Sequence, residues 1–183
     1  SDQAAALGRE VLPANELLTL ADYRSRYAQY RSDADLQALH AAAPMIAVWD
    51  DHEIANDTWK DGAENHTEGG GTGGEGSFTT RRAAAVQAWH EWLPVRSGAD
   101  LLSIYRSFSF GNLLALHMLD TRVLARDLQL DYADYTTATG LDAAGFTAAL
   151  SDTSRQLLGS TQTGWLTAQM SASTATWQVL GQQ

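Results

Sequence analysis

The chain contains no cysteine, so it has no disulfide, no thiolate nucleophile and no cysteine-ligated zinc site. It also has no run of the roughly eighteen or more apolar residues that a membrane-spanning helix requires. The first residues, Ser1-Asp2-Gln3, lack the basic segment followed by an apolar one that marks a secretion signal. These absences predict a chain without a membrane span, and they leave its compartment open.

Basic residues are scarce as well: 12 Lys and Arg stand against 22 Asp and Glu, for a net charge of −10. Proteins that bind nucleic acid need a basic face to neutralise the phosphates. The charge balance therefore argues against a nucleic-acid partner. It does not exclude a phosphate ester substrate, because bound metal ions invert the local electrostatic field.

Two common catalytic signatures are missing. There is no Gly-x-Ser-x-Gly motif, and no serine stands near a plausible histidine base in the sequence, which argues against a hydrolase that works without metal. The glycine-rich stretch 69–76 lacks the Gly-Lys-Ser/Thr ending of a phosphate-binding loop. Its composition predicts a flexible surface loop, and a mobile lid beside a site is the alternative.

The residues that are present predict a single folded domain over residues 1–183, since 44% are hydrophobic and six are tryptophan. Three-and-four spacing of apolar residues predicts helices, and apolar or alternating runs predict strands. The predicted helices span 19–31, 34–42, 80–95 and 161–171, and the predicted strands span 45–49, 104–110, 113–119 and 177–180. An irregular surface excursion is expected at 125–160. This mixture indicates an α/β fold in the broad sense that includes α+β.

Single side chains on the predicted helices have structural interpretations. Tyr23, Tyr27 and Tyr30 recur at helical spacing, which is typical of a face that packs into the core. His90 has no carboxylate cluster at ligand spacing, so we expect a structural role for it.

The predicted strand at 45–49 is the stretch around which the rest of the chain is organised. Five consecutive apolar residues with β-branched Ile46 and Val48 are typical of a strand buried on both faces. The sequence then turns abruptly to Asp50-Asp51-His52-Glu53. Ligands in α/β sheets gather beyond the carboxyl ends of strands, so this cluster is a candidate site.

The chemistry of the cluster has two interpretations. Adjacent carboxylates oppose each other's ionisation, and a bound cation removes that cost. Carboxylate oxygens suit hard metals, and a neighbouring imidazole binds either the metal or a substrate. A solvated acidic turn after a strand is the alternative, and periodicity does not decide between them.

A second charged cluster, Asp120-Thr121-Arg122, follows the predicted strand 113–119. Arg122 is suited to clamp a phosphoryl oxygen. From spacing alone, an ion pair with Asp120 is the simpler expectation. The predicted buried strand 177–180 is followed by only three residues, which suggests a segment of a longer protein.

Several segments together carry a family resemblance. They are 22–28, 35–40, 49–53, 56–57, 59, 62–66, 105–106, 119–122, 158–159, 162, 165–166 and 177–183. In this order they resemble the PhoD-like alkaline phosphatases of the calcineurin-like metallophosphoesterase superfamily. The resemblance implies the central portion of a catalytic domain in which helices flank a two-layered β-sandwich with two metals at one edge.

The resemblance also implies roles for five residues. The superfamily's Gly-Asn-His-Asp/Glu motif corresponds to residues 50–53, which makes Asp51 a metal ligand and His52 the imidazole that contacts the phosphate and assists the leaving oxygen. Gln182 lies where the superfamily has a ligand histidine, and its amide oxygen suits a hard cation. Asn65 and Arg122 are the expected substrate-binding residues. The family implies Ca²⁺ and Fe³⁺ as the metals.

The implied activity is hydrolysis of small-molecule phosphoesters, as monoesterase or diesterase, by a metal-activated water. The family also implies a periplasmic or secreted protein. Its first ligands precede the matched region and its last ligands follow it, so a complete two-metal centre is not expected in the 183-residue chain by itself. The alternative is a catalytically silent fragment or an interaction module derived from such an enzyme.

Overall fold

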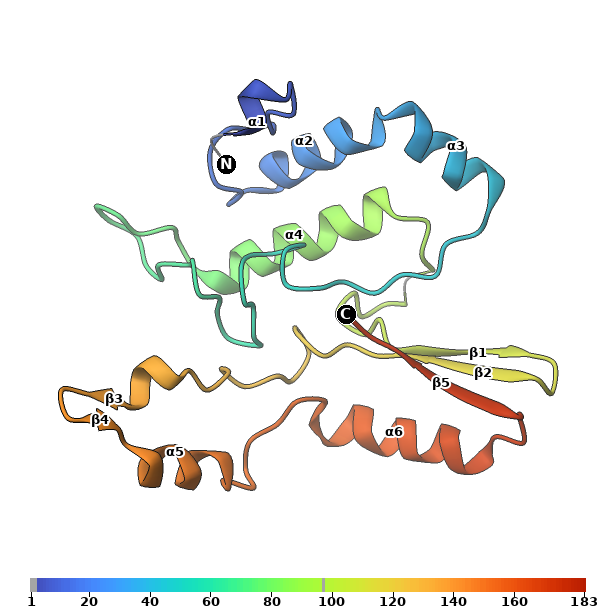
Figure 1. Ribbon diagram of the computed structural model, residues 1–183. Helices are drawn as coiled ribbons and strands as arrows, with labels where there is room; N and C mark the ends of the chain where they lie inside the picture. The colour runs from blue at the N-terminus through green and yellow to red at the C-terminus, as the bar shows by residue number, and fades with distance from the viewer. Residues whose placement is uncertain (1–2, 97) are drawn as a thin grey trace.

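Helices and a small mixed sheet lie in separate layers of the computed structural model, which describes residues 3–96 and 98–183 (Figure 1). Ser1, Asp2 and Ser97 lie outside the described residues. The helices are α1 (Gln3–Ala6), α2 (Leu20–Arg31), α3 (Ala34–Ala42), α4 (Phe78–Trp92), the 3-10 helix η1 (Tyr132–Tyr135), α5 (Ala143–Leu150) and α6 (Gly159–Ala172). The strands are β1 (Arg106–Phe110), β2 (Leu114–Met118), β3 (Thr136–Thr137), β4 (Gly140–Leu141) and β5 (Trp177–Gly181).

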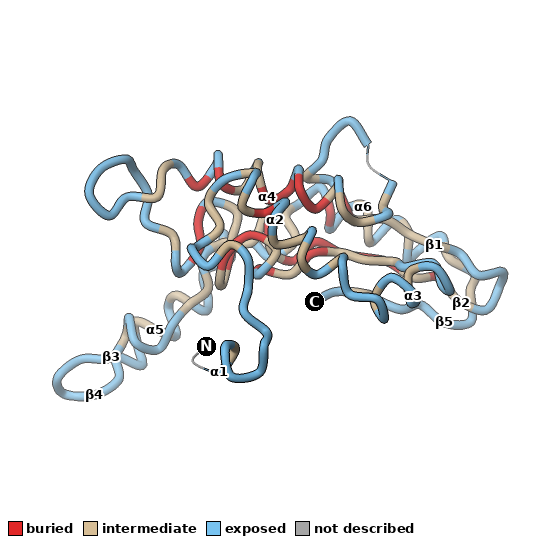
Figure 2. Tube along the Cα trace, turned by 90° about the horizontal axis from the view of Figure 1, so that it is seen from above, coloured by how far each residue is buried: buried red, intermediate tan, exposed pale blue. Residues whose placement is uncertain are grey.

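The hydrophobic core lies beneath α2 and α4 (Figure 2). Helix α2 begins with a capping box, in which Thr19 accepts a hydrogen bond from the Asp22 N–H and the Asp22 carboxylate accepts one from the Thr19 N–H. Tyr23 from α2 and Trp89 from α4 are buried, and Trp89 meets Trp49 edge to face with ring centroids 5.1 Å apart. The predicted helices at 19–31, 34–42, 80–95 and 161–171 are confirmed, with ends shifted by up to three residues.

The sheet has the strand order β1-β2-β5. The predicted strands at 104–110 and 113–119 are confirmed as the antiparallel pair β1 and β2, with ends shifted by up to two residues. Gly111 adopts a φ of 59° in the turn between them, where a side chain would be strained. Strand β5 lies parallel to β2, with Leu116 opposite Val179. The carboxyl ends of β2 and β5 therefore meet at one edge, and residues 119–122 leave the sheet there.

The predicted strand at 45–49 is wrong. These residues form no regular secondary structure, and no strand among the described residues pairs with them. Trp49 is buried at the end of the run, whereas Met45 is exposed, so the run is anchored by one aromatic residue and not by a ladder. A guanidinium N–H of Arg106 donates a 2.7 Å hydrogen bond to the Ala47 carbonyl and replaces part of that ladder.

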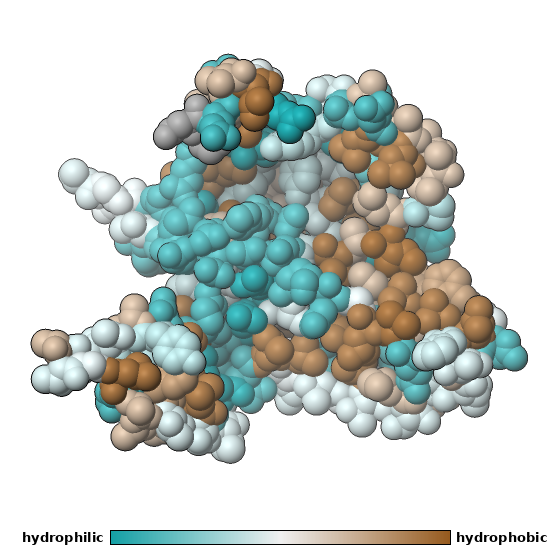
Figure 3. Space-filling view, viewed as in Figure 1, coloured by the Kyte–Doolittle hydropathy of each residue, from teal (hydrophilic) through white to brown (hydrophobic). Residues whose placement is uncertain are grey.

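Two burial expectations are also wrong. Tyr30 is 56% exposed, because α2 packs on α4 through its Tyr23 and Tyr27 side. Strand β5 is an exposed edge strand and not a buried one, with Trp177 at 64% exposure. Figure 3 shows hydrophobic residues over this end of the molecule.

The excursion expected at 125–160 forms a lobe that projects from the two layers (Figures 1 and 2). It contains η1, the short β3-β4 hairpin and α5. Phe146 of α5 stacks on Tyr132 and meets Tyr135 edge to face, which gives the lobe a small aromatic cluster of its own. No helix among the described residues combines the length and apolar character needed to cross a bilayer.

Candidate active site at the Asp50 to Asp57 loop

A tight turn follows Trp49 and presents the acidic cluster. The Asp51 carbonyl accepts hydrogen bonds from the N–H groups of Ile54 and Ala55, at 2.8 and 2.9 Å. The side chains of Ile54 and Ala55 are buried in the core. The buried side chains of Ile54 and Ala55 therefore anchor the turn to the core. Figure 3 shows hydrophilic residues gathered on the middle of the face over this loop.

Asp51 is a buried carboxylate with built-in partners. Its Oδ2 accepts a 2.6 Å hydrogen bond from the Asp57 N–H, and its Oδ1 lies 3.8 Å from a guanidinium nitrogen of Arg122. Burial raises the pKa of Asp51, but the Asp57 N–H and the Arg122 charge outweigh it, so the pKa lies below its ordinary value. The carboxylate is therefore ionised at neutral pH.

Asp57 holds a backbone conformation that most residues avoid, with a φ of 49°. Aspartate tolerates this left-handed region better than residues other than glycine and asparagine. The conformation directs its N–H at Asp51. The loop therefore uses backbone strain at Asp57 to place a donor on the candidate ligand.

His52 projects into solvent, with 73% of its side chain exposed. Its Nε2 lies 2.7 Å from the Asn56 Oδ1 and 3.7 Å from the Asp51 Oδ2. The Asn56 oxygen, followed by the Asp51 charge, raises the pKa of His52 because both stabilise the imidazolium. The imidazole is thus an accessible group that holds its proton to a higher pH than a free histidine.

Arg122 joins the edge of the sheet to this loop. Its guanidinium lies 3.1 Å from Asp50 and 3.5 Å from Asp57, in addition to its contact with Asp51. The expected Arg122–Asp120 ion pair is wrong: Asp120 instead accepts hydrogen bonds from the backbone N–H groups of Arg122 and Val123. The arginine therefore serves three carboxylates of a loop more than sixty residues away in sequence.

Asp120 anchors the segment that carries Arg122. Its side chain is fully buried, and burial raises its pKa against the hydrogen bonds that lower it. Gln162 of α6 clamps its backbone: the amide oxygen accepts from the Asp120 N–H at 2.9 Å and the amide nitrogen donates to the Asp120 carbonyl at 2.8 Å. Sequence reasoning gave no role to Asp57, Asn56 or Gln162 in this arrangement, since only the fold brings them to the site.

Asn65 and Gln182 lie differently with respect to this cluster. The Asn65 side-chain oxygen accepts a 2.9 Å hydrogen bond from the Asn56 N–H. Asn65 therefore contacts Asn56, the residue that pairs with His52. Gln182 follows β5 and is exposed, and among the described residues no interaction joins it to Asp51 or His52. Its neighbour Gln183 instead bonds to the Thr121 hydroxyl.

Comparison with known proteins identifies the family to which this chain belongs. The family model described as PhoD-like phosphatase matches residues 1–183. The chain belongs to the PhoD-like phosphatase family. It is 40% identical, over 173 residues, to the alkaline phosphatase D of Bacillus subtilis (strain 168).

A solved structure described as "Structure of PhoD" aligns with this PhoD-like chain with a TM-score of 0.69 and 38% identity. The predicted α/β fold and family are therefore confirmed. The alignments cover 92% and 93% of this chain, but only 27% of the Bacillus subtilis protein and 30% of the solved chain. The chain thus spans less than a third of the length of either relative.

The PhoD-like chain offers a candidate metal ligand in Asp51. Asp51 offers an ionised carboxylate, whose Oδ1 lies 3.8 Å from a guanidinium nitrogen of Arg122. Among the described residues, no group of three or more His, Asp or Glu is arranged to hold a metal ion. These residues alone therefore do not fit the two-metal centre that the family resemblance implies.

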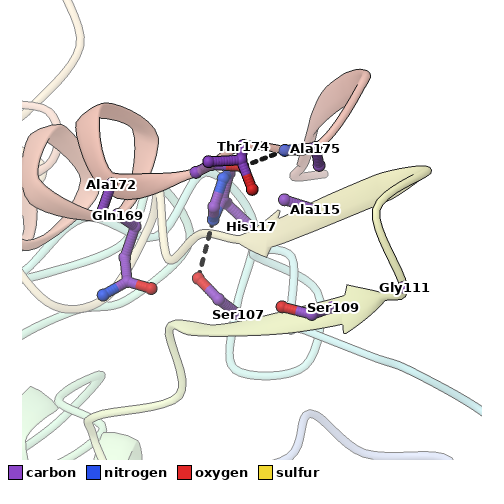
Figure 4. Close-up of a pocket in the computed structure, with 10 residues that line it drawn as sticks. Ser107, Ser109, Gly111, Ala115, His117, Gln169, Ala172, Thr174 and Ala175 are labelled. Atoms are coloured by element: carbon purple, nitrogen blue, oxygen red, sulfur yellow. Dashed lines mark hydrogen bonds between the residues drawn. The ribbon is translucent and has the colours of Figure 1, made fainter.

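Two cavities of the PhoD-like chain are lined in part by a histidine. One of 300 Å³ opens beside His52 and is lined in part by Tyr27, Tyr30 and Glu53. The other, of 260 Å³, lies between the β1-β2 hairpin and the end of α6 (Figure 4). There the Ser107 hydroxyl lies 2.7 Å from the His117 Nδ1, a serine beside a histidine that the sequence did not reveal. Within the described residues the His117 Nε2 has no hydrogen-bond partner, so a catalytic triad is not formed.

Proposed function

We propose that this chain is part of a phosphoester hydrolase acting on small-molecule phosphate monoesters or diesters. Membership of the PhoD-like family and similarity to an alkaline phosphatase D support the reaction class. The observation that carries the proposal is the Arg122 guanidinium, which binds Asp50, Asp51 and Asp57 beside an exposed His52. A periplasmic or secreted location is part of the proposal.

In this proposal His52 contacts the phosphoryl group and gives a proton to the leaving oxygen. Its exposure lets a substrate reach it, and its raised pKa keeps the proton available near neutral pH. Asn56 sets the ring orientation through its 2.7 Å contact with Nε2. His52 is therefore the proposed catalytic residue, and Asn56 positions it.

Asn65 and Arg122 are the proposed substrate-binding residues. Asn65 is hydrogen-bonded to the backbone of Asn56. Arg122 joins the acidic loop to the edge of the sheet through its ion pair with Asp50. An arginine between several carboxylates also offsets their repulsion, which an anionic phosphate would otherwise meet. Both residues are thus proposed to affect how tightly the acidic loop binds an anionic phosphate.

Asp51 and Gln182 are the proposed metal ligands, with Ca²⁺ and Fe³⁺ as the expected ions. The ionised Asp51 carboxylate supports its part of this assignment. We propose that the rest of the coordination shell comes from regions of the longer protein that correspond to the unmatched parts of the relatives. A metal centre of this kind would polarise the phosphoryl group and lower the pKa of a water molecule.

The test is hydrolysis of p-nitrophenyl phosphate by the full-length protein, with added Ca²⁺ and Fe³⁺ and then with a chelator. We expect turnover that the chelator abolishes and the metals restore. Turnover that is unaffected by the chelator contradicts the metal assignment, and absence of turnover with monoesters and diesters contradicts the hydrolase. The isolated 183-residue chain is expected to be inactive in the same assay.

A further inference from the structure

A cavity of 420 Å³ lies where the projecting lobe meets the segment that follows Arg122. Leu130, Phe146, Leu150 and Leu157 form its apolar wall. Leu150 and Leu157 are 61% and 47% exposed, so this wall faces solvent. Figure 3 shows hydrophobic residues within the lobe, surrounded by more polar ones. The cavity thus offers an apolar surface of the size that a small organic group fills.

Two arginines line the same cavity. Arg126 and Arg155 are partly buried, and neither forms an ion pair with a carboxylate among the described residues. Arg155 donates instead to the Leu128 carbonyl, and Arg126 makes a long 3.4 Å contact with Gln129. The single carboxylate in the lining, Asp127, is already paired with Lys60 at 2.5 Å. Arg155 interacts electrostatically with Asp127 and with the nearby Asp152 without forming an ion pair. The lining thus holds two guanidinium groups and a single carboxylate in a chain of net charge −10.

The cavity is also connected to the acidic loop. Gln129, in its lining, donates a 3.1 Å hydrogen bond to the Asp57 carbonyl, and the Asp57 N–H donates to Asp51. Arg126 interacts electrostatically with both Asp57 and Asp51. The cavity near His52 differs, because it contains the Glu53 carboxylate and its Arg26 guanidinium donates to the Leu12 and Pro13 carbonyls.

We propose that the cavity between Arg126 and α5 is a specificity subsite that holds the apolar group of an anionic phosphate ester. The leucines and Phe146 contact an aryl or alkyl group, and Arg126 and Arg155 attract the negative charge. The phosphoryl end of the same molecule lies toward the Asp51 and His52 loop. This assignment rests on the proposed hydrolase and defines the ester it prefers: a phosphate ester with a bulky apolar substituent.

The test compares binding of diphenyl phosphate and dimethyl phosphate to the full-length protein by calorimetry, with a chelator present to prevent turnover. Both probes carry one negative charge, and they differ in apolar area. We expect diphenyl phosphate to bind about tenfold more tightly. Equal affinity for the two probes overturns the subsite.

Matched variants locate the binding. Leu150→Glu is expected to weaken diphenyl phosphate binding about tenfold by placing a carboxylate in the cavity, with little cost to folding because Leu150 is exposed. Leu141→Glu is the control, since Leu141 is an exposed leucine of the same lobe outside the cavity lining. Equal effects of the two substitutions contradict the location. Arg126→Gln should weaken binding of both probes, and unchanged binding contradicts the role of the arginine.

The outcomes separate this inference from the proposed function. Selective binding of diphenyl phosphate by a protein that hydrolyses no phosphoester retains the subsite and overturns the hydrolase. Metal-dependent hydrolysis with equal binding of the two probes retains the hydrolase and overturns the subsite.

Discussion

At the scale of single residues, the site depends on pairs of groups that set each other's protonation. Asp51 is ionised because a backbone N–H and Arg122 offset the cost of its burial. The Asn56 oxygen and the Asp51 charge raise the pKa of His52. An accessible imidazole that holds its proton thus stands beside a buried carboxylate that stays ionised, so the two groups differ in protonation at neutral pH.

The pKa of His52 tests its pairing with Asn56. Asn56→Ala removes the acceptor that stabilises the imidazolium, so we expect the pKa of His52 to fall toward its ordinary value of 6.5. Any stability from this pair is present below the unfolded-state pKa and is lost as the pH rises through the folded-state pKa. An NMR titration of the histidine ring measures the shift.

Asn112→Ala, in the β1-β2 turn, serves as the control for that titration, because the partners of His52 among the described residues are Asn56 and Asp51. An unchanged His52 pKa in the Asn56 variant would show that the contact does not control protonation.

The lowered pKa of Asp51 makes the free energy of unfolding depend on pH in the acid range. Its folded-state pKa lies below the ordinary 3.8, so the stability it provides is present above that value and is lost as the pH falls through the folded-state pKa. We expect Asp51→Asn to lower the free energy of unfolding at pH 7 by about 1–3 kcal/mol, since a charge-assisted hydrogen bond is weakened.

We also expect that this difference shrinks as the pH falls below about 4. Urea unfolding at several pH values provides the measurement, and a difference that stays constant with pH contradicts the assignment. Asp50→Asn, at a half-exposed carboxylate of the same loop, is the control and should change stability less.

At the scale of elements, the site depends on the junction of β2, α6 and the acidic loop. The sequence predicted the elements that carry strong periodicity, namely the helices α2, α4 and α6 and the strands β1 and β2. It also placed the candidate cluster at residues 50–53. The 45–49 strand was wrong because an apolar run has the same pattern whether or not a partner strand lies beside it.

Long-range pairings were not predictable. Arg122 was expected to pair with nearby Asp120, yet it binds carboxylates that only the tertiary fold brings within 4 Å. In the sequence, Gln162 is an ordinary polar residue of a predicted helix. Only the structure shows that its amide forms hydrogen bonds with both backbone groups of Asp120. Spacing in the sequence carries no information about such contacts.

Gln162 is expected to be the most sensitive residue of this junction. Gln162→Ala leaves the Asp120 N–H and carbonyl without partners in a buried place, which should cost about 1–3 kcal/mol for each group. Thr163→Ala, at the next and exposed residue of α6, should change stability little. Denaturant unfolding of both variants tests this, and equal stabilities would contradict the clamp.

At the scale of the whole molecule, the chain combines a helical layer, a three-stranded sheet and a projecting lobe around one polar face. It belongs to the PhoD-like phosphatase family and spans less than a third of its relatives' length. The described residues hold an acidic loop, an arginine and a histidine, without a cluster of three metal-ligating side chains. We therefore propose that the catalytic centre belongs to the full-length protein and that this chain supplies Asp51 and His52 to it.

The most direct test is the turnover number of the full-length protein with His52→Ala, compared with His40→Ala as a histidine of α3 outside the site. We expect a loss of about 100-fold or more in kcat for His52→Ala, because the substitution removes the proposed general acid. Thermal stability should change little, because His52 is mostly exposed. Near-normal turnover by the His52 variant, or an equal loss in the His40 variant, would contradict the account.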